Sequence, residues 1–181
     1  MRMRFVVPIA LALILPMVAG ADDAASVKKK AEANYAKMKS AFTKKDLKGY
    51  MSAYADNFAG VGMMGQKAGK AQAEVEMKQH IADTQKINSA GFKVSDVKVK
   101  GDKATGKVDF HLDCVTLDSM GMMGAKGKSH RLVMDDQQNV TWTKAGGKWL
   151  IVKEAPTGIS HMSVDGKPFN PGAPPTPPKK K

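Results

Sequence analysis

The residues best suited to bind a metal lie in two copies of the tetrapeptide Gly-Met-Met-Gly, at residues 62–65 and 121–124. Methionine thioethers are ligands for Cu(I). Adjacent residues of a strand point to opposite faces, so each copy presents one or two sulfur atoms to one side. A three-ligand site would therefore require the two copies to meet, or His111 or His130 to join one of them. Because methionine more often fills irregular apolar space, we expect two hairpin connections whose glycines provide the turns and which bind no metal.

A second group with chemical potential lies on one strand-like segment. Asp109, His111 and Asp113 alternate along it, so their side chains share one face. A histidine beside a carboxylate can transfer protons, but an outward, solvated polar face is the simpler interpretation and the one we expect. Zinc is not expected, because ligand spacing is lacking among the histidines of the sequence, which are His80, His111, His130 and His161.

Residues 1–21 have the layout of a secretory signal peptide. Two arginines precede an apolar run from Phe5 to Val18, and Ala19-Gly20-Ala21 offers a small-residue cleavage site. A retained membrane anchor is the alternative, but the run is shorter than the roughly 20 residues that span a bilayer. We expect export to the periplasm or the exterior, with Asp22 first in the mature chain. The single cysteine, Cys114, cannot form an internal disulfide, and we expect a buried, unreactive thiol.

The 181-residue chain is basic, with a formal net charge of +12. Its lysines are scattered and only 6% of its residues are aromatic, so it lacks the interleaved basic and aromatic stripe that binds nucleic acid. We expect no nucleic-acid partner. The charge serves solubility, and attraction to anionic envelope surfaces is a second use. A basic, envelope-associated interaction module is therefore one alternative function.

Apolar residues recur at helical spacing in the first half of the mature chain. The first stripe includes Tyr35 and Met38, and the second, which includes Tyr54, follows a candidate N-cap at Asp46. A short strand then leads to a turn at Gly65. The pattern predicts helices near 26–43, 46–55 and 69–87.

From Phe92 onward the apolar period changes to two, which predicts strands near 92–100, 104–117, 129–144 and 148–155. A two-residue turn at Gly146-Gly147 would place Trp142 and Trp149 on one face, where they anchor a core or wall a pocket. The order of elements indicates an α+β domain over residues 22–165. Residues 166–181 form a Pro- and Lys-rich tail that we expect to be disordered.

Two segments resemble the nuclear transport factor 2-like superfamily, in its exported, SnoaL-like bacterial branch of unknown function. They are "KKDLKGYMSAYADNF", which is similar to the second-helix signature, and "VTWTKAGGKWLIVKE", which is similar to the closing hairpin. The resemblance covers most of residues 26–170. It implies a cone-shaped fold with three helices packed on a curved, mostly antiparallel sheet, an apolar pocket and frequent dimerisation. Ketosteroid isomerase, scytalone dehydratase and polyketide cyclases share this fold with many non-catalytic members, so the resemblance implies a pocket and not a reaction.

The catalytic residues of the isomerase branch do not carry over to this sequence. The position of the base falls on Gly62 and that of the phenol on Met38, and neither side chain can transfer a proton. Tyr35 lies about one helical turn away, so a shifted donor stays an alternative.

We therefore predict an exported protein that binds a small apolar or amphipathic molecule, without catalysis and without a cofactor. The alternatives are a cyclase, isomerase or dehydratase of the same fold, Met-based Cu(I) binding, and the envelope-associated module. A homodimer is compatible with each. The residues predicted to bind the ligand are Tyr35, Met38, Tyr54, Met63, Met122, Trp142 and Trp149.

Overall fold

A computed structural model describes residues 22–61, 65–124 and 126–170 of the chain. The predicted signal peptide lies outside the described residues, as do Met63 and Met64 of the first Gly-Met-Met-Gly copy and residues 171–181 of the tail. The predictions made for these segments stay predictions.

The first two helices begin where acidic side chains cap them. α1 (Ala24–Thr43) starts after Asp23, whose carboxylate accepts a hydrogen bond from Ser26 N at 2.7 Å. α2 (Leu47–Met51) starts after Asp46, which accepts from Gly49 N at 2.9 Å, as predicted. The apolar stripe of α1 is buried, and its members are Val27, Ala31, Tyr35, Met38 and Ala41.

Two predicted helix ends were wrong. α2 stops at Met51 and not near residue 55, because Tyr54 begins strand β1 (Tyr54–Val61), which pairs in parallel with β6 (Lys148–Val164). α3 (Lys70–Asp83) stops before Thr84 and not at residue 87. From Thr84 the chain is the start of β3 (Thr84–Lys100), so tertiary strand pairing overrides the local helix preference here.

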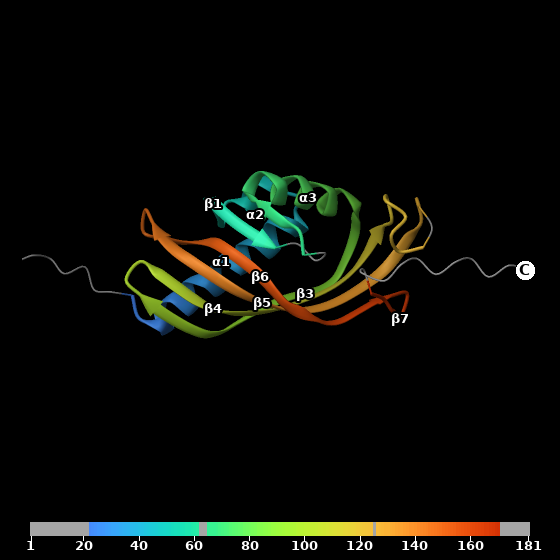
Figure 1. The fold of residues 1–181 in the computed structure, drawn as a ribbon. Coiled ribbons are helices and arrows are strands. Elements are labelled where there is room, and N and C mark those ends of the chain that lie inside the picture. The colour runs from blue at the N-terminus through green and yellow to red at the C-terminus, as the bar shows by residue number, and fades with distance from the viewer. Residues whose placement is uncertain (1–21, 62–64, 125, 171–181) are drawn as a thin grey trace, which may run out of the picture.

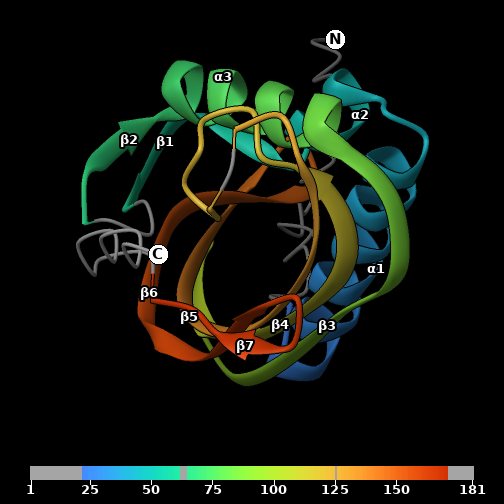
Figure 2. The same ribbon diagram turned by 90° about the vertical axis from the view of Figure 1, so that its right-hand side faces the viewer.

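Within the described residues, seven strands form one curved sheet. The others are β2 (Lys67–Gly69), β4 (Lys103–Leu117), β5 (Ser129–Ala145) and β7 (Lys167–Pro168). The order is β2-β1-β6-β5-β4-β3, with β7 beside the end of β6, and every pairing except β1–β6 is antiparallel. Figure 1 shows α2 and α3 above the concave side of the sheet, and Figure 2 shows β3 to β6 curling around a common axis. The α+β fold class is as predicted.

The β5–β6 hairpin confirms the prediction for the two tryptophans. Gly146 and Gly147 have φ values of +55° and +76°, the left-handed region that a two-residue hairpin turn of this kind requires. Ala145 and Lys148 are paired across the turn. Trp142 and Trp149 are each 1% exposed and belong to the core.

Strand β6 continues to Val164, although the sequence pattern predicted an end near residue 155. The register of the β5–β6 pair shifts between Gln137 and Gln138 and again between Thr141 and Trp142 of β5. On β6, these two shifts lie on either side of Pro156. A proline has no N–H to donate, and irregular positions of a ladder tolerate it. A turn at Asp165-Gly166 then leads to β7, so the first residues of the predicted tail pair with β6.

The second Gly-Met-Met-Gly copy lies in the connection between β4 and β5, as predicted. The side chain of Asp118, only 2% exposed, accepts hydrogen bonds from the backbone N–H groups of Met122 and Met123 at 2.8 and 2.9 Å. Gly121 has φ +80°, a conformation that residues with a Cβ resist. Met122 itself is 45% exposed. A buried carboxylate thus shapes this loop from beneath and leaves the methionine outside.

No helix in the described ranges has both the length and the apolar character needed to cross a bilayer.

We predict that Asp118→Asn destabilises the protein while Met122→Leu does not. Asparagine keeps the shape of the side chain but offers a single acceptor oxygen, so one buried N–H loses its partner and the free energy of unfolding should fall by about 1–3 kcal/mol. Met122→Leu changes an exposed side chain and should stay within about 0.5 kcal/mol of wild type. Urea unfolding of the three proteins measures both effects, and equal stability of the two variants would contradict this role of Asp118.

Candidate functional site

The ligand-binding residues predicted on helices and strands come together in the interior. Each is at most 7% exposed, and all belong to the main core cluster; they are Tyr35, Met38, Tyr54, Trp142 and Trp149. Met122 is instead half exposed in the β4–β5 connection, and Met63 lies outside the described residues. The binding role of these residues stays a prediction.

A carboxyl group lies among the tyrosines of this interior. The Tyr54 hydroxyl donates a hydrogen bond to Glu154 Oε2 at 3.2 Å. Tyr35 lies within electrostatic reach of the same carboxyl, but its buried hydroxyl makes no hydrogen bond in the part of the chain that the structure describes. Burial, and to a smaller extent a negative charge at Asp136, raise the pKa of Glu154 to about 7 against the opposing effect of the two hydroxyls. Glu154 can therefore gain or lose a proton near neutral pH.

Sequence reasoning missed Glu154 because a bulge changes which face it occupies. Strict alternation from Trp149 and Ile151 would point Lys153 inward and Glu154 outward. In the β5–β6 ladder, however, Trp142 pairs with Ile151 and the preceding Thr141 pairs with Lys153. The extra residue on β6 reverses the alternation, so Lys153 is exposed and Glu154 is largely covered. The sequence around Glu154 contains no signal from which this reversal of the strand's two faces could be recognised.

The phenols around Glu154 are neutral donors at physiological pH. Burial is the main reason why the pKa values of Tyr35, Tyr50 and Tyr54 lie above their usual value, and the charge of Glu154 raises them further. The ring of Tyr50 stacks on that of Tyr54 at 6.2 Å between centroids. The helices α1 and α2 and the strand β1 thus each bring one tyrosine hydroxyl near the carboxyl of Glu154.

A second carboxyl in this region is only partly satisfied. Asp136 on β5 is 6% exposed, and its Oδ2 accepts a hydrogen bond from Gln138 Nε2 at 3.1 Å. Its Oδ1 is buried without a hydrogen-bond partner among the described residues. Burial raises the pKa of Asp136 as well. A buried acceptor of this kind costs free energy until a donor reaches it.

A cavity of about 590 Å³, within the size range of small-molecule sites, is lined by Asp136 and lies one aromatic ring away from Tyr35. Phe92 connects the two, because it lines the cavity and stacks on Tyr35 at 4.8 Å between ring centroids. Phe110 and Asp136 also line it. The cavity is therefore bordered by aromatic rings and by the buried carboxyl of Asp136.

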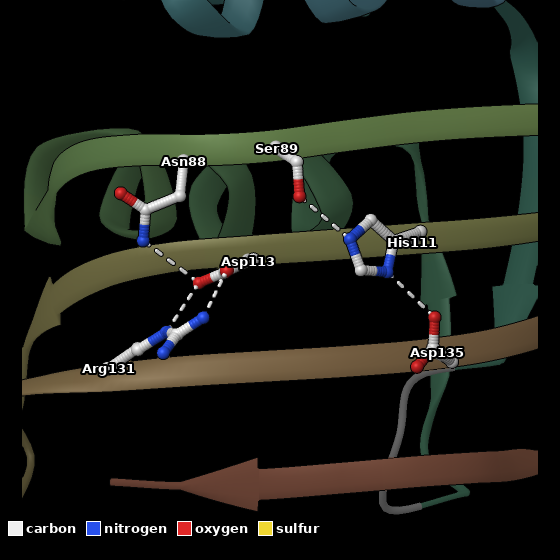
Figure 3. Close-up of polar contacts among 6 residues, drawn as sticks. All are labelled: Asn88, Ser89, His111, Asp113, Arg131 and Asp135. Carbon is white, nitrogen blue, oxygen red and sulfur yellow. Dashed lines mark hydrogen bonds and ion pairs between the residues drawn. The ribbon is translucent and has the colours of Figure 1, made fainter. Parts of the chain in front are cut away.

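The polar face predicted on β4 is present, and Figure 3 shows it. His111 pairs with a carboxylate, but the partner is Asp135 on β5 at 2.8 Å. Asp113 instead binds Arg131 at 2.7 Å and Asn88 at 2.9 Å. These contacts, with Arg131 first, lower the pKa of Asp113 to about 2.

Cys114 is buried, as predicted. Cys114 is 1% exposed, and burial raises its pKa to about 11. The thiol is therefore protonated at neutral pH and unreactive.

The described residues do not form a cluster of metal-binding side chains of the common types. In the ranges that the structure describes, no three histidine, cysteine, aspartate or glutamate side chains converge on one point. A copper site shared by the two Gly-Met-Met-Gly copies would involve Met63 and Met64, which are outside those ranges.

Three helices packed on a strongly curved, mostly antiparallel sheet are the architecture of the nuclear transport factor 2-like fold, and comparison with solved structures agrees. A nuclear transport factor 2-like protein from Cytophaga hutchinsonii superimposes with a TM-score of 0.53 at 12% identity, over 70% of this chain and 93% of the other. A conserved protein from Planctomyces limnophilus gives 0.57 at 13% identity, over 72% and 94%. A ketosteroid isomerase-like protein from Erwinia carotovora gives 0.53 at 14% identity, over 72% and 96%.

At such identities the comparisons establish the fold and leave the activity open. No family model and no curated relative matches the sequence.

Glu154→Gln should flatten the pH dependence of stability between about pH 4.5 and 7. The unfolded chain releases this proton near the ordinary pKa of 4.5, whereas the folded protein holds it to about 7. Wild-type stability should therefore fall as the pH rises through this window, by at most about 3 kcal/mol. Urea unfolding of both proteins from pH 4.5 to 8 measures the effect. Asp136 and His80 also have shifted pKa values, but both proteins contain them, so subtracting the two stability curves leaves the contribution of Glu154. A stability difference that does not change with pH would contradict the raised pKa of Glu154.

Tyr35→Phe and Tyr54→Phe should change stability in opposite directions. The first removes a buried hydroxyl that lacks a partner, so the free energy of unfolding should rise by about 1 kcal/mol; the second removes the donor to Glu154, so it should fall by about 1–3 kcal/mol. Calorimetry at pH 8 on protein refolded from denaturant, which removes any retained ligand, makes the comparison. A loss of stability in both variants would show that the Tyr35 hydroxyl has a partner in the free protein.

Proposed function

We propose that this protein is exported and binds a small, mostly apolar molecule inside the cone, with one oxygen atom of that molecule at Tyr35 and Glu154. The observation that carries the proposal is the buried, unpartnered hydroxyl of Tyr35 beside a carboxyl whose pKa is about 7. Export rests on the layout of residues 1–21, and the destination is the periplasm or the exterior.

The first step of the argument is energetic. A buried hydroxyl without a hydrogen bond costs about 1–3 kcal/mol, and proteins seldom keep one without a use for it. Asp136 Oδ1 is a second such atom, and Asp136 lines the same cavity as Phe92. A ligand that supplies an oxygen to Tyr35 and a donor to Asp136 would recover both costs. This arrangement favours a mostly apolar molecule that carries a hydrogen-bond acceptor and a hydrogen-bond donor.

The second step concerns the chemistry of the ligand. Tyr35 is a neutral phenol, and Glu154 is protonated in a large fraction of molecules at neutral pH, so both can donate to an oxygen atom. A carbonyl or a phenolic hydroxyl is therefore the favoured group. Phe92 and Phe110, whose rings lie 5.1 Å apart between centroids, would contact a ring or an alkyl chain.

One observation favours a second function, proton transfer on a bound carbonyl compound. A carboxyl with a pKa near 7 beside phenolic donors has the properties of a general base assisted by hydrogen-bond donors. Catalysis requires a reacting carbon of the ligand to lie within reach of Glu154, whereas binding requires only its oxygen. The burial of Tyr35 and Tyr54 against the core supports a fixed binding wall, so we favour binding.

2-Naphthol is a suitable probe because it is fluorescent, apolar and carries one hydroxyl. We expect wild-type protein to bind it, and Tyr35→Phe to bind it about tenfold more weakly, which corresponds to the loss of one hydrogen bond. Val75→Ala, which alters a residue of α3 that is 64% exposed, is the control and should bind like wild type. Native mass spectrometry of protein purified from its own host should show a retained small molecule. Absence of naphthol binding together with a bare protein mass would overturn the proposal.

A further inference from the structure

A serine, a histidine and an aspartate on three neighbouring strands form a continuous hydrogen-bonded relay. Ser89 on β3 has its Oγ 2.8 Å from His111 Nε2, and His111 Nδ1 on β4 lies 2.8 Å from Asp135 Oδ1 on β5. Figure 3 shows the imidazole between the other two side chains. This is the order of contacts that activates a serine for nucleophilic attack.

The relay lies on the face of the sheet opposite to the interior site. Gly91 pairs with His111, and His111 pairs with Asp135, so these positions share one face. The next residue, Phe92, points the other way and stacks on Tyr35 of α1. The relay is thus separate from the tyrosine cluster, and its histidine and aspartate side chains are 42% and 43% exposed. The inference below does not rest on the proposed ligand-binding function.

The chemistry of the partners fixes the tautomer of His111. A carboxylate can only accept, so Nδ1 carries the proton that it donates to Asp135. Nε2 of the neutral ring then has a free lone pair and accepts from the Ser89 hydroxyl. Ser89 Oγ is therefore hydrogen-bonded to a base that is ready to take its proton.

Space for a reacting group is available beside the relay. Gly91 stands directly across from His111, and a Cβ placed on it would meet nothing within 4 Å.

A second set of contacts holds the three strands in register next to the relay. Asp113 accepts hydrogen bonds from Asn88 on β3 and from Arg131 on β5, at 2.9 and 2.7 Å. Because Asn88 is adjacent to Ser89 in the chain, this set restrains the nucleophile's own strand. Groups fixed in this way keep the geometry that attack requires.

We propose that Ser89 is a nucleophile that accepts an acyl group from small carboxylic esters. Ser89 Oγ bonds to the ester carbonyl carbon while its proton passes to His111 Nε2. The bond from that carbon to the alkoxy oxygen breaks, and the leaving alcohol takes the proton from His111. Water then attacks the acyl-serine by the same route, so that Ser89 is regenerated and a carboxylic acid is released. Asp135 acts as a positioning residue, which holds the ring and stabilises the imidazolium.

The test uses 4-nitrophenyl acetate and the full-length protein at pH 8. We expect a burst of 4-nitrophenol and, by peptide mass spectrometry, an acetyl group on Ser89. Ser89→Ala and His111→Gln should lower the burst rate by about 100-fold or more, the usual contribution of a general base. Asp135→Asn should lower it while moving the pH profile, because the ring loses its fixed tautomer.

Ser95→Ala is the matched control, since Ser95 lies on the same strand but pairs with Lys107 and not with a histidine. It should react like wild type, and thermal melting should show that every variant is folded. Acetylation confined to lysines, or an unchanged burst in Ser89→Ala, would overturn the proposal. The second result would mean that His111 attacks the ester by itself.

Discussion

The interior of this protein depends on keeping one carboxyl group in apolar surroundings. Glu154 would be costly to bury as an ion, and its pKa of about 7 reflects that cost. The Tyr54 hydroxyl offsets part of it, and it can do so because β1 runs parallel to β6 at this place. The short α2, the start of β1 and the bulge of β6 are all needed to bring the two groups together. The site is therefore a product of strand irregularity as much as of residue choice.

Most of the fold could be predicted from local patterns. The buried stripe of α1, the cap at Asp46 and the Gly146-Gly147 turn follow from spacing and backbone preference, and the structure has each of them. The ends of α2 and α3 could not be predicted, because the strand pairing that ends them involves residues far away in the chain. For the same reason, Glu154 was not recognisable. A one-residue bulge reverses the two faces of a strand, and no composition signal announces it.

The candidate site was predictable in part, and the reason lies in how each group is positioned. Tyr35, Met38 and Tyr54 followed from the helical stripes, which bury side chains at fixed spacing. The partner of His111 did not, because Asp109 and Asp113 are neighbours in sequence whereas Asp135 reaches it across the β4–β5 ladder. Contacts across a ladder depend on register, which long strands can satisfy in several ways until a turn or bulge fixes it.

The position of β3 at one end of the strand order has a consequence for how copies of this chain behave at high concentration. A long edge strand with free backbone groups is a template on which further chains can add, strand by strand. β3 carries Lys86, Lys93, Lys98 and Lys100, and its register against β4 shifts around Asp96, which has φ +54°. Repeated positive charge repels an identical strand, and the irregular backbone denies it a continuous ladder. The same strand that supplies Ser89 and Phe92 is thereby protected against growing into a fibre.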